Sequence, residues 1–470
     1  MTVQPEETLE RHSIDYIPTN ARHGRPRDLF TIWFASNVNV GSAVTGALAV
    51  WIGLDLRFAL LAIVCGNLIG AVFMAYHSVQ GPRLGVPQMI QSRAQFGFLG
   101  AVLPMLITIA MYLGFQIEGG VVVGQALAHR TGAPQALCVV AFNSVAVLIA
   151  LFGYRLIHRL SRVTTVVSGL IFAGFLVKLV SDLGSVHVPT HAATVSQFLL
   201  ALSFSISWQI TWAPYVSDYS RYLPEETSAQ KTFWFTYAGS VISATLTMAI
   251  GALAVVVAGD AFGADALGYL TGLFGGLATV AFWLLIICGF GGASGPYGAF
   301  LTGFAALSGR GADPDQTPKV RAAFVIVFGA VAATLAIAAS ADLVTTFTNI
   351  TLFLLYLLVP WTAINLTDYF LVRRGRYDID QLFERHGRYG FLNAPAVVIY
   401  LVAILIQIPF INTPLYEGTI AKHLNGADIA WIVGLVFSAL AYLVLSKSTA
   451  TKGARSDVGS KSRSAASSTH

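Results

Sequence analysis

The sequence predicts an all-α integral membrane protein with twelve transmembrane helices. Hydrophobic residues make up 55% of the 470 residues and charged residues only 11%, with a mean hydropathy of +0.68. That balance leaves too few polar groups to cover a soluble globule of this size. Apolar stretches of about 20 residues, long enough to cross a bilayer, recur along the chain. The Lys and Arg residues gather on one side when these stretches are threaded through a membrane in alternating directions.

The predicted spans begin after a polar segment. The first 28 residues contain no apolar core, so we expect no cleavable signal peptide, and the first helix directs insertion. The twelve spans are 29–51, 57–77, 99–128, 134–153, 163–182, 195–216, 233–258, 273–307, 321–339, 343–367, 391–411 and 428–446.

The basic residues predict the orientation of these spans. With both termini inside, the outside loops receive only Arg57, Arg130 and Lys422 of the 28 Lys and Arg residues, and Lys178 lies near the outer end of its span. We therefore expect a multi-pass protein of the cell (plasma or inner) membrane with cytoplasmic N and C termini, in contact with membrane lipid. The formal net charge of +5 is then a topology signal, and it does not indicate a nucleic-acid partner.

Polar and small residues interrupt some of the spans. Span 29–51 contains FASNVNVGSAVTG, span 195–216 contains SWQITWAP, and span 273–307 contains CGFGGASGPYG. At membrane depth, a backbone leaves helical geometry only where protein buries it or where it lines a cavity. The first two interruptions lie five helices apart, which is typical of inverted repeats whose first helices are broken around a site. We expect the breaks near Asn39 and Gln209.

This organisation divides the chain into five parts. They are a cytoplasmic N-terminal segment (1–28), a first five-helix repeat (29–182), a second, inverted repeat (195–367), two peripheral helices (391–446) and a disordered cytoplasmic tail (447–470). The sequence does not specify an oligomeric state.

Enzyme and channel functions are disfavoured. The ten histidines are scattered in loops or near helix ends without zinc-type spacing, and Cys65, Cys138 and Cys288 lie in apolar spans. No repeated filter or continuous polar helix face indicates a channel. We expect no catalytic site, no metal site and no cofactor other than a coupling cation.

Four stretches resemble the nucleobase:cation symporter family, the purine–cytosine permeases. They are RPRDLFTIWFASNVNVGSAVTGA, the step from Gly114 to Phe115, APYVSDYSRYLP, and PWTAINLTDYFLVRRGRYD at 360–378. The resemblance covers about residues 10–450. It implies a LeuT-like fold of five plus five helices, and a secondary active transporter that imports a nucleobase or related planar nitrogen heterocycle by cation symport through alternating access.

The resemblance also implies an aromatic pocket. A planar heterocycle offers two π faces, so a pocket stacks rings on them and meets the rim with polar groups. The family position for the ring in the sixth helix is Gln209 here, and its neighbour Trp208 is the ring we favour. Phe115, where family members usually have Trp, is expected on the opposite face. Trp212 either packs elsewhere or closes the pocket.

Glu118 is the most informative polar residue. A carboxyl group near the bilayer centre is costly, so it normally faces a cavity. It either binds a neighbouring helix in protonated form, meets ring nitrogens of the ligand, or carries a coupling proton. Other candidate contacts to the ligand come from spans one, three, six and eight: Asn37, Asn39, Ser42, Gln116, Gln209 and Ser294.

The coupling ion is expected to be a proton. In sodium-using members, two hydroxyl side chains from span eight bind the cation, and the corresponding positions here fall near Phe290 and Gly291, which have none. Ser294 is the remaining hydroxyl nearby. The alternative is a sodium-coupled transporter of allantoin, hydantoin or a pyrimidine vitamin precursor.

Overall fold

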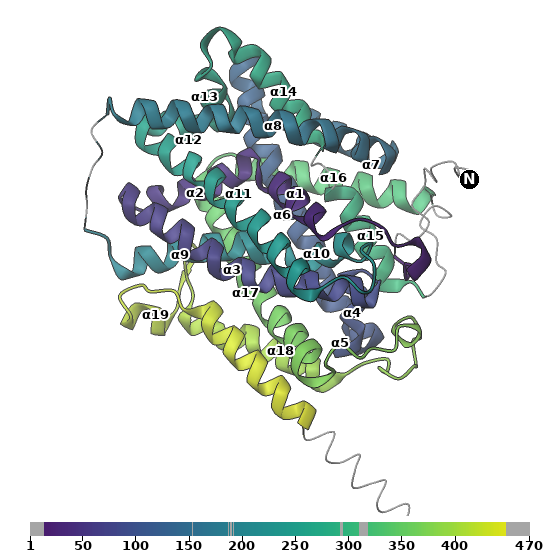
Figure 1. Cartoon of the computed structure of the whole chain (residues 1–470). Coiled ribbons are helices and arrows are strands. Elements are labelled where there is room, and N and C mark those ends of the chain that lie inside the picture. Colours follow the sequence, from purple (N-terminus) through teal and green to yellow (C-terminus); the bar gives the residue numbers. More distant parts are fainter. Residues whose placement is uncertain are drawn as a thin grey trace, which may run out of the picture.

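A computed structural model describes residues 14–152, 154–186, 188, 190, 192–291, 295–309 and 318–447. The described chain is mostly helical, and its long helices lie across one another (Figure 1). Of the predicted parts, segment 1–28 is described from residue 14 onward. The predicted disordered tail lies outside the described residues except for residue 447.

Among the described residues, the chain up to Leu183 contains eight α-helices. They are α1 (Pro26–Asn37), α2 (Val40–Trp51), α3 (Leu56–Leu84), α4 (Gln88–Gln91), α5 (Arg93–Gly100), α6 (Val102–Thr131), α7 (Gln135–Phe152) and α8 (Tyr154–Leu183), preceded by a 3-10 turn at Thr19–Ala21.

The second half continues with α9 (Val195–Thr211), α10 (Ala213–Ser220), α11 (Ala229–Ala258), α12 (Asp260–Ala264), α13 (Ala266–Gly272), α14 (Ala278–Gly291), α15 (Gly295–Leu307), α16 (Pro318–Ala339) and α17 (Leu343–Leu366). A 3-10 turn at Gly275–Leu277 precedes α14. A π-helical segment, Thr367–Val372, extends α17.

The C-terminal part is partly irregular. It contains a 3-10 turn at Asp380–Leu382, α18 (Ala394–Gln407), a 3-10 turn at Ile408–Phe410, α19 (Thr419–His423) and a last helix, Ala430–Lys447. Between α18 and α19, the two-residue strands β1 (Asn412–Thr413) and β2 (Tyr416–Glu417) form an antiparallel hairpin in which Asn412 pairs with Glu417.

Each predicted span contains a helix. Within the described residues, seven helices are long and apolar enough to cross a membrane: Leu56–Leu84, Val102–Thr131, Val166–Leu183, Ala229–Ala258, Pro318–Ala339, Leu343–Val372 and Ala430–Lys447. Shorter apolar helices lie at Val40–Trp51, Gln135–Leu151, Gly275–Gly289 and Ala394–Phe410. The membrane-protein prediction is confirmed, and the count of twelve spans stays a prediction.

The first span is broken at the expected residue. Asn39, between α1 and α2, has an extended backbone (φ −148°, ψ 164°). Its side chain accepts a hydrogen bond from the backbone N–H of Ser42 at 2.9 Å and donates one to the carbonyl of Ser36 at 2.9 Å. One amide side chain thus satisfies backbone groups on both sides of the break, which stabilises two helix ends that would otherwise be unpaired in an apolar medium.

The sixth span is divided differently. The helix α9 continues through Gln209, and the division falls at Trp212, whose backbone stays in the helical region (φ −80°, ψ −22°). Pro214 provides the reason, because it lacks an N–H and its ring crowds the carbonyl four residues earlier. The position expected near Gln209 is therefore corrected to Trp212, and the division is a bend rather than an extended segment.

The helices pack in two groups. In the first, which we call the bundle, α1, α2, α3, α9, α10 and α11 contact one another. In the second, the scaffold, α6, α7, α15 and α16 do so. Bundle helices approach closely at glycines: a side chain at Gly46 or Gly251 would overlap backbone atoms of the facing helix. Small residues allow this backbone contact between membrane helices.

Candidate functional site

A narrow cavity lies where α6, α9 and α17 meet. Its lining is formed by Phe115, Glu118, Ser207, Trp208, Thr211, Ile350, Thr351 and Leu354. The cavity volume is about 10 Å³, which is close to the space of one water molecule. A ligand larger than water therefore requires helix or side-chain movement at this site.

Aromatic rings form one wall of the cavity. The ring centroids of Phe115 and Trp208 are 5.9 Å apart at an interplanar angle of 69°, and those of Phe115 and Trp212 are 6.1 Å apart at 25°. Phe115 and Trp208, which the sequence predicts on opposite faces of a ligand, line the same cavity. Because the two rings contact each other edge to face here, their stacking on two faces of a ligand stays a prediction.

Trp208 is fixed by α1. Its indole N–H donates to Oδ1 of Asn37 at 2.7 Å, and Nδ2 of Asn37 donates to the Trp33 carbonyl at 2.7 Å. Asn37 is therefore fully engaged in holding the ring, and it does not line the cavity. In this conformation it holds the Trp208 ring in place, and its predicted contact with a ligand stays a prediction.

Gln209 points away from the cavity into the bundle. Its Nε2 donates to Oδ1 of Asn67 at 2.7 Å, and its Oε1 accepts from Ser240 at 2.6 Å. The side chain is fully buried. Because both ends of the amide are paired between α3 and α11, Gln209 joins helices, and the ring at the neighbouring position faces the cavity.

Glu118 is the charged residue among those that line the cavity. Its Oε1 atom is buried and has no hydrogen-bond partner among the described residues, and the same is true of the Ser42 hydroxyl in α2. Through Oε1, Glu118 therefore binds no neighbouring helix in this conformation. An unpaired carboxyl group beside aromatic rings is available for a ligand or a proton.

The remaining predicted residues lie elsewhere. Gln116 points to α7, where its Nε2 donates to Asn143 at 3.1 Å. Asn39 caps the helix break, and Trp212 packs on Phe115 without lining the cavity. Ser294 and the side chain of Phe290 lie outside the described residues, so the proposed ion position on span eight stays a prediction.

Sequence reasoning missed the contribution of α17. Ile350, Thr351 and Leu354 line the cavity, and Oδ1 of nearby Asn349 is buried without a partner. The signal was present, because TTFTNIT at 345–351 is a polar interruption of an apolar span like those in spans one and six. It was overlooked because it lacks the glycines and prolines that mark a broken helix.

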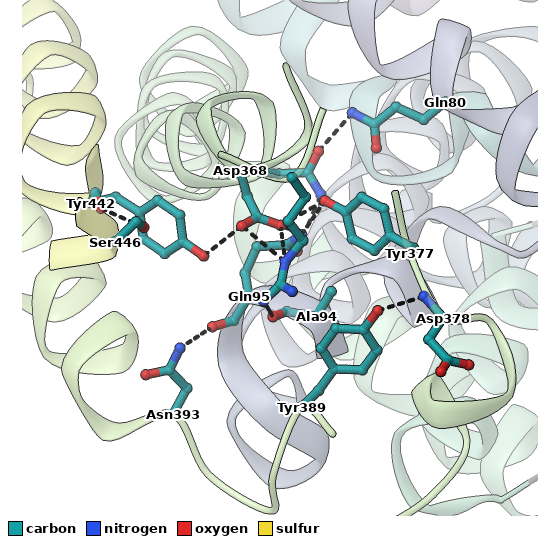
Figure 2. A network of polar contacts seen from close by, with 12 residues as sticks. Gln80, Ala94, Gln95, Asp368, Tyr377, Asp378, Tyr389, Asn393, Tyr442 and Ser446 are labelled. Carbon is teal, nitrogen blue, oxygen red and sulfur yellow. Dashed lines mark hydrogen bonds and ion pairs between the residues drawn. The ribbon is translucent and has the colours of Figure 1, made fainter. Parts of the chain in front are cut away.

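A second polar group, the Asp368 cluster, lies at the end of α17 and comprises Gln95, Asp368, Arg373, Tyr377 and Tyr442 (Figure 2). The fully buried Asp368 carboxylate accepts from Gln95 Nε2 at 2.8 Å, the Tyr377 hydroxyl at 2.6 Å, the Tyr442 hydroxyl at 2.9 Å and Arg373 Nε at 3.0 Å. It joins α5, the loop after α17 and the last helix.

The charge of the cluster is balanced. Burial lowers the pKa of the Arg373 guanidinium, but the Asp368 carboxylate together with Tyr442, Tyr377 and Tyr389 outweighs that cost, so the pKa of Arg373 lies above its ordinary value. The guanidinium also donates to the Ala94 carbonyl at 3.0 Å. The Asp368 carboxylate and the Arg373 guanidinium therefore find their hydrogen-bond partners within the protein.

A helix broken beside a buried site and a second helix bent there are the architecture of secondary transporters with inverted repeats. The fold matches Mhp1 in its inward-facing conformation with a TM-score of 0.73 over 96% of both chains at 19% identity. It also matches Mhp1, titled a nucleobase-cation-symport-1 family transporter, in a closed conformation with bromovinylhydantoin bound (TM-score 0.72, 95% and 97% of the chains, 18% identity). The predicted LeuT-like architecture is confirmed.

The chain belongs to the family described as permeases for cytosine/purines, uracil, thiamine and allantoin, whose sequence profile matches residues 16–434. It is 40% identical over 450 residues to the putative purine-cytosine permease YxlA of Bacillus subtilis, covering 93% of this chain and 96% of that protein. It is 25% identical over 466 residues to the purine-cytosine permease fcyB of Emericella nidulans, covering 94% and 89%. The protein is a membrane transporter and not an enzyme.

Proposed function

We propose that the protein imports a nucleobase, or a related planar nitrogen heterocycle, together with a proton. The observation that carries this proposal is the unpaired Glu118 carboxyl group beside Phe115 and Trp208. The rings suit a flat aromatic ligand, and the carboxyl group suits ring N–H groups. The names of the relatives, purine-cytosine permeases, support the same substrate class.

In the proposed cycle, Glu118 takes up a proton on the outer side. The neutral acid then meets the ligand, so the proton and the ligand cross together. Opening to the inner side hydrates the carboxyl group, which releases the proton. The narrow cavity described above has to widen around the ligand during this cycle.

The proposed orientation has both termini in the cytoplasm. Arg221 at the end of α10 donates to the Asp15 carbonyl of the N-terminal segment at 3.0 Å, and Arg93 of α5 donates to the Leu382 carbonyl beyond α17 at 3.1 Å. These contacts bring loops that the sequence assigned to the inner side together. They support the plasma (inner) membrane topology drawn from the basic residues.

Membrane lipid is the proposed partner of the outer helix faces. Leu170 and Val177 on α8, Val327 on α16 and Val444 on the last helix are each more than half exposed. Aliphatic side chains exposed on helices of bilayer-spanning length are suited to lipid tails.

Transport in proteoliposomes tests the coupling. An inward proton gradient should drive accumulation of labelled cytosine or adenine, a protonophore should abolish it, and replacement of sodium by choline should leave it unchanged. Glu118→Gln should impair accumulation more than counterflow exchange, because exchange needs no net proton movement.

The second candidate is sodium-coupled transport of allantoin, hydantoin or a pyrimidine vitamin precursor. The family description, which names thiamine and allantoin, favours this breadth of substrates. Sodium-dependent binding in detergent at fixed pH, measured by thermal shift across these compounds and the nucleobases, would replace the proton proposal with this one.

A further inference from the structure

Gly41 occupies an unusual position beside the candidate site. It is the second residue of α2, and its φ lies outside the left-handed region, so the backbone there does not require glycine. Glycine in a helix costs about 1 kcal/mol relative to alanine. Some other constraint therefore accounts for a residue without a side chain at this position.

The constraint is the space taken by Glu118. A methyl group on Gly41 would overlap Oε1 of Glu118 and would lie 3.1 Å from its Cδ. Oε1 is the buried atom that has no hydrogen-bond partner in the described structure. The carboxyl group thus lies directly against the first turn of α2, in room that only glycine leaves open.

We propose that Gly41 is a positioning residue that sets where the Glu118 carboxyl group meets the ligand. This inference rests on the proposed function, because it takes Glu118 as the group that the ligand contacts. The first turn of α2 carries partial positive charge, which favours a carboxyl oxygen beside it. The Glu118 side chain thereby occupies the space beside the N-terminal end of α2.

The arrangement defines the class of ligand. Since Glu118 covers the start of α2, a ligand meets a carboxyl group there and not free backbone amides. A neutral ring with N–H groups on its edge suits that surface, whereas a ring that carries its own carboxylate brings a second acid to a cavity whose described lining offers no cation.

The test is a rescue experiment on the full-length protein, with binding measured by thermal shift and calorimetry. The ligands are cytosine, adenine, uracil, hydantoin and allantoin, with orotate as the carboxylated analogue. Gly41→Ala should weaken binding of the best ligand by about tenfold or more, because the added methyl group displaces the carboxyl group. Glu118→Asp, one methylene shorter, should also weaken it.

Combining the two changes should restore much of the affinity, to within about threefold of the parent protein, because the shorter acid leaves room for the methyl group. A merely structural role of Gly41 predicts no such rescue. Gly119→Ala is the matched control: it lies next to Glu118, but an added methyl group there makes an ordinary 3.4 Å contact with Phe142.

Two results would overturn the inference alone: unchanged binding in Gly41→Ala, or loss of binding that Glu118→Asp does not rescue although the double variant unfolds at the parent's temperature. Orotate binding as tight as that of uracil would overturn the ligand class. A parent protein that binds none of the heterocycles would overturn the proposed function as well.

Discussion

Two carboxyl groups inside this protein have opposite surroundings: Asp368 is fully buried, whereas Glu118 is partly exposed and has one enclosed oxygen, Oε1. Asp368 accepts hydrogen bonds from four side chains on three segments of the chain, whereas Oε1 of Glu118 has no partner among the described residues. Glu118 lies in the predicted span 99–128, and Asp368 directly follows the predicted span 343–367. The difference teaches that a buried acid by itself does not identify a binding site, since the saturated one holds helices together and the unsaturated one remains available.

The largest expected effect is the loss of stability when Asp368 is replaced. Asp368→Ala leaves a guanidinium and two tyrosine hydroxyls without their acceptor, and breaking such a buried pair costs about 3–5 kcal/mol. We expect a large fall in the unfolding temperature in detergent, or no folded protein. Glu384→Ala, which removes an exposed carboxylate from the following loop, is the control and should unfold like the parent protein.

Trp208→Ala tests whether the aromatic ring beside Glu118 binds the ligand. Removal of the ring should weaken binding of a planar ligand by about 1–3 kcal/mol, or roughly 5- to 150-fold. Trp208→Phe retains a stacking ring but loses the N–H that binds Asn37, so its affinity should lie between the two. Unchanged affinity in Trp208→Ala would move the ligand away from this cavity.

Tyr442→Phe removes one hydroxyl from the Asp368 cluster and leaves the ring in place. The loss of one hydrogen bond to a buried charge should cost about 1.5–3 kcal/mol of stability. Ligand affinity should not change, because Tyr442 lies outside the cavity lining. A change in affinity without a change in unfolding temperature would show that the cluster acts on the site.

Glu118→Gln should have the smallest effect on stability. The substitution keeps the size of the side chain and breaks no hydrogen bond to the described Oε1 atom, so the free energy of unfolding should change by less than about 0.5 kcal/mol. Thermal unfolding without ligand measures this. A loss as large as that of Asp368→Ala would abolish the contrast between the two acids.

The sequence predicted the first helix break well because the residue type and its local role coincide. Asn39 caps a helix end wherever the chain leaves helical geometry, and this is visible without tertiary structure. Gln209 misled for the opposite reason: it is polar, but its partners Asn67 and Ser240 are distant in sequence. The packing of α3 and α11 on α9 pairs the Gln209 side chain, so α9 continues through this residue without a break.

The candidate site shows the same limit. The family resemblance implies Phe115 and Trp208, and the cost of a carboxyl group within span 99–128 indicates Glu118, whereas the α17 wall depends on how the two repeats pack. The motif at 360–378 stood out in the sequence, yet its part in the Asp368 cluster depends on Gln95 and Tyr442, far away along the chain. Local patterns identified elements, and the partners of each polar group required the fold.

The two hydrogen bonds of the Asn39 side chain have a mechanical consequence. An intact helix is stiff because backbone hydrogen bonds connect each turn to the next. Between α1 and α2, the Asn39 side chain replaces them: it donates to the Ser36 carbonyl and accepts from the Ser42 amide. Each of these bonds is worth about 0.5–1.5 kcal/mol. The joint itself is therefore a weak point in the backbone, at which both helices can keep their own backbone hydrogen bonds. Since α1 and α2 both pack on α11, the contacts with α11 and not the joint hold their relative tilt.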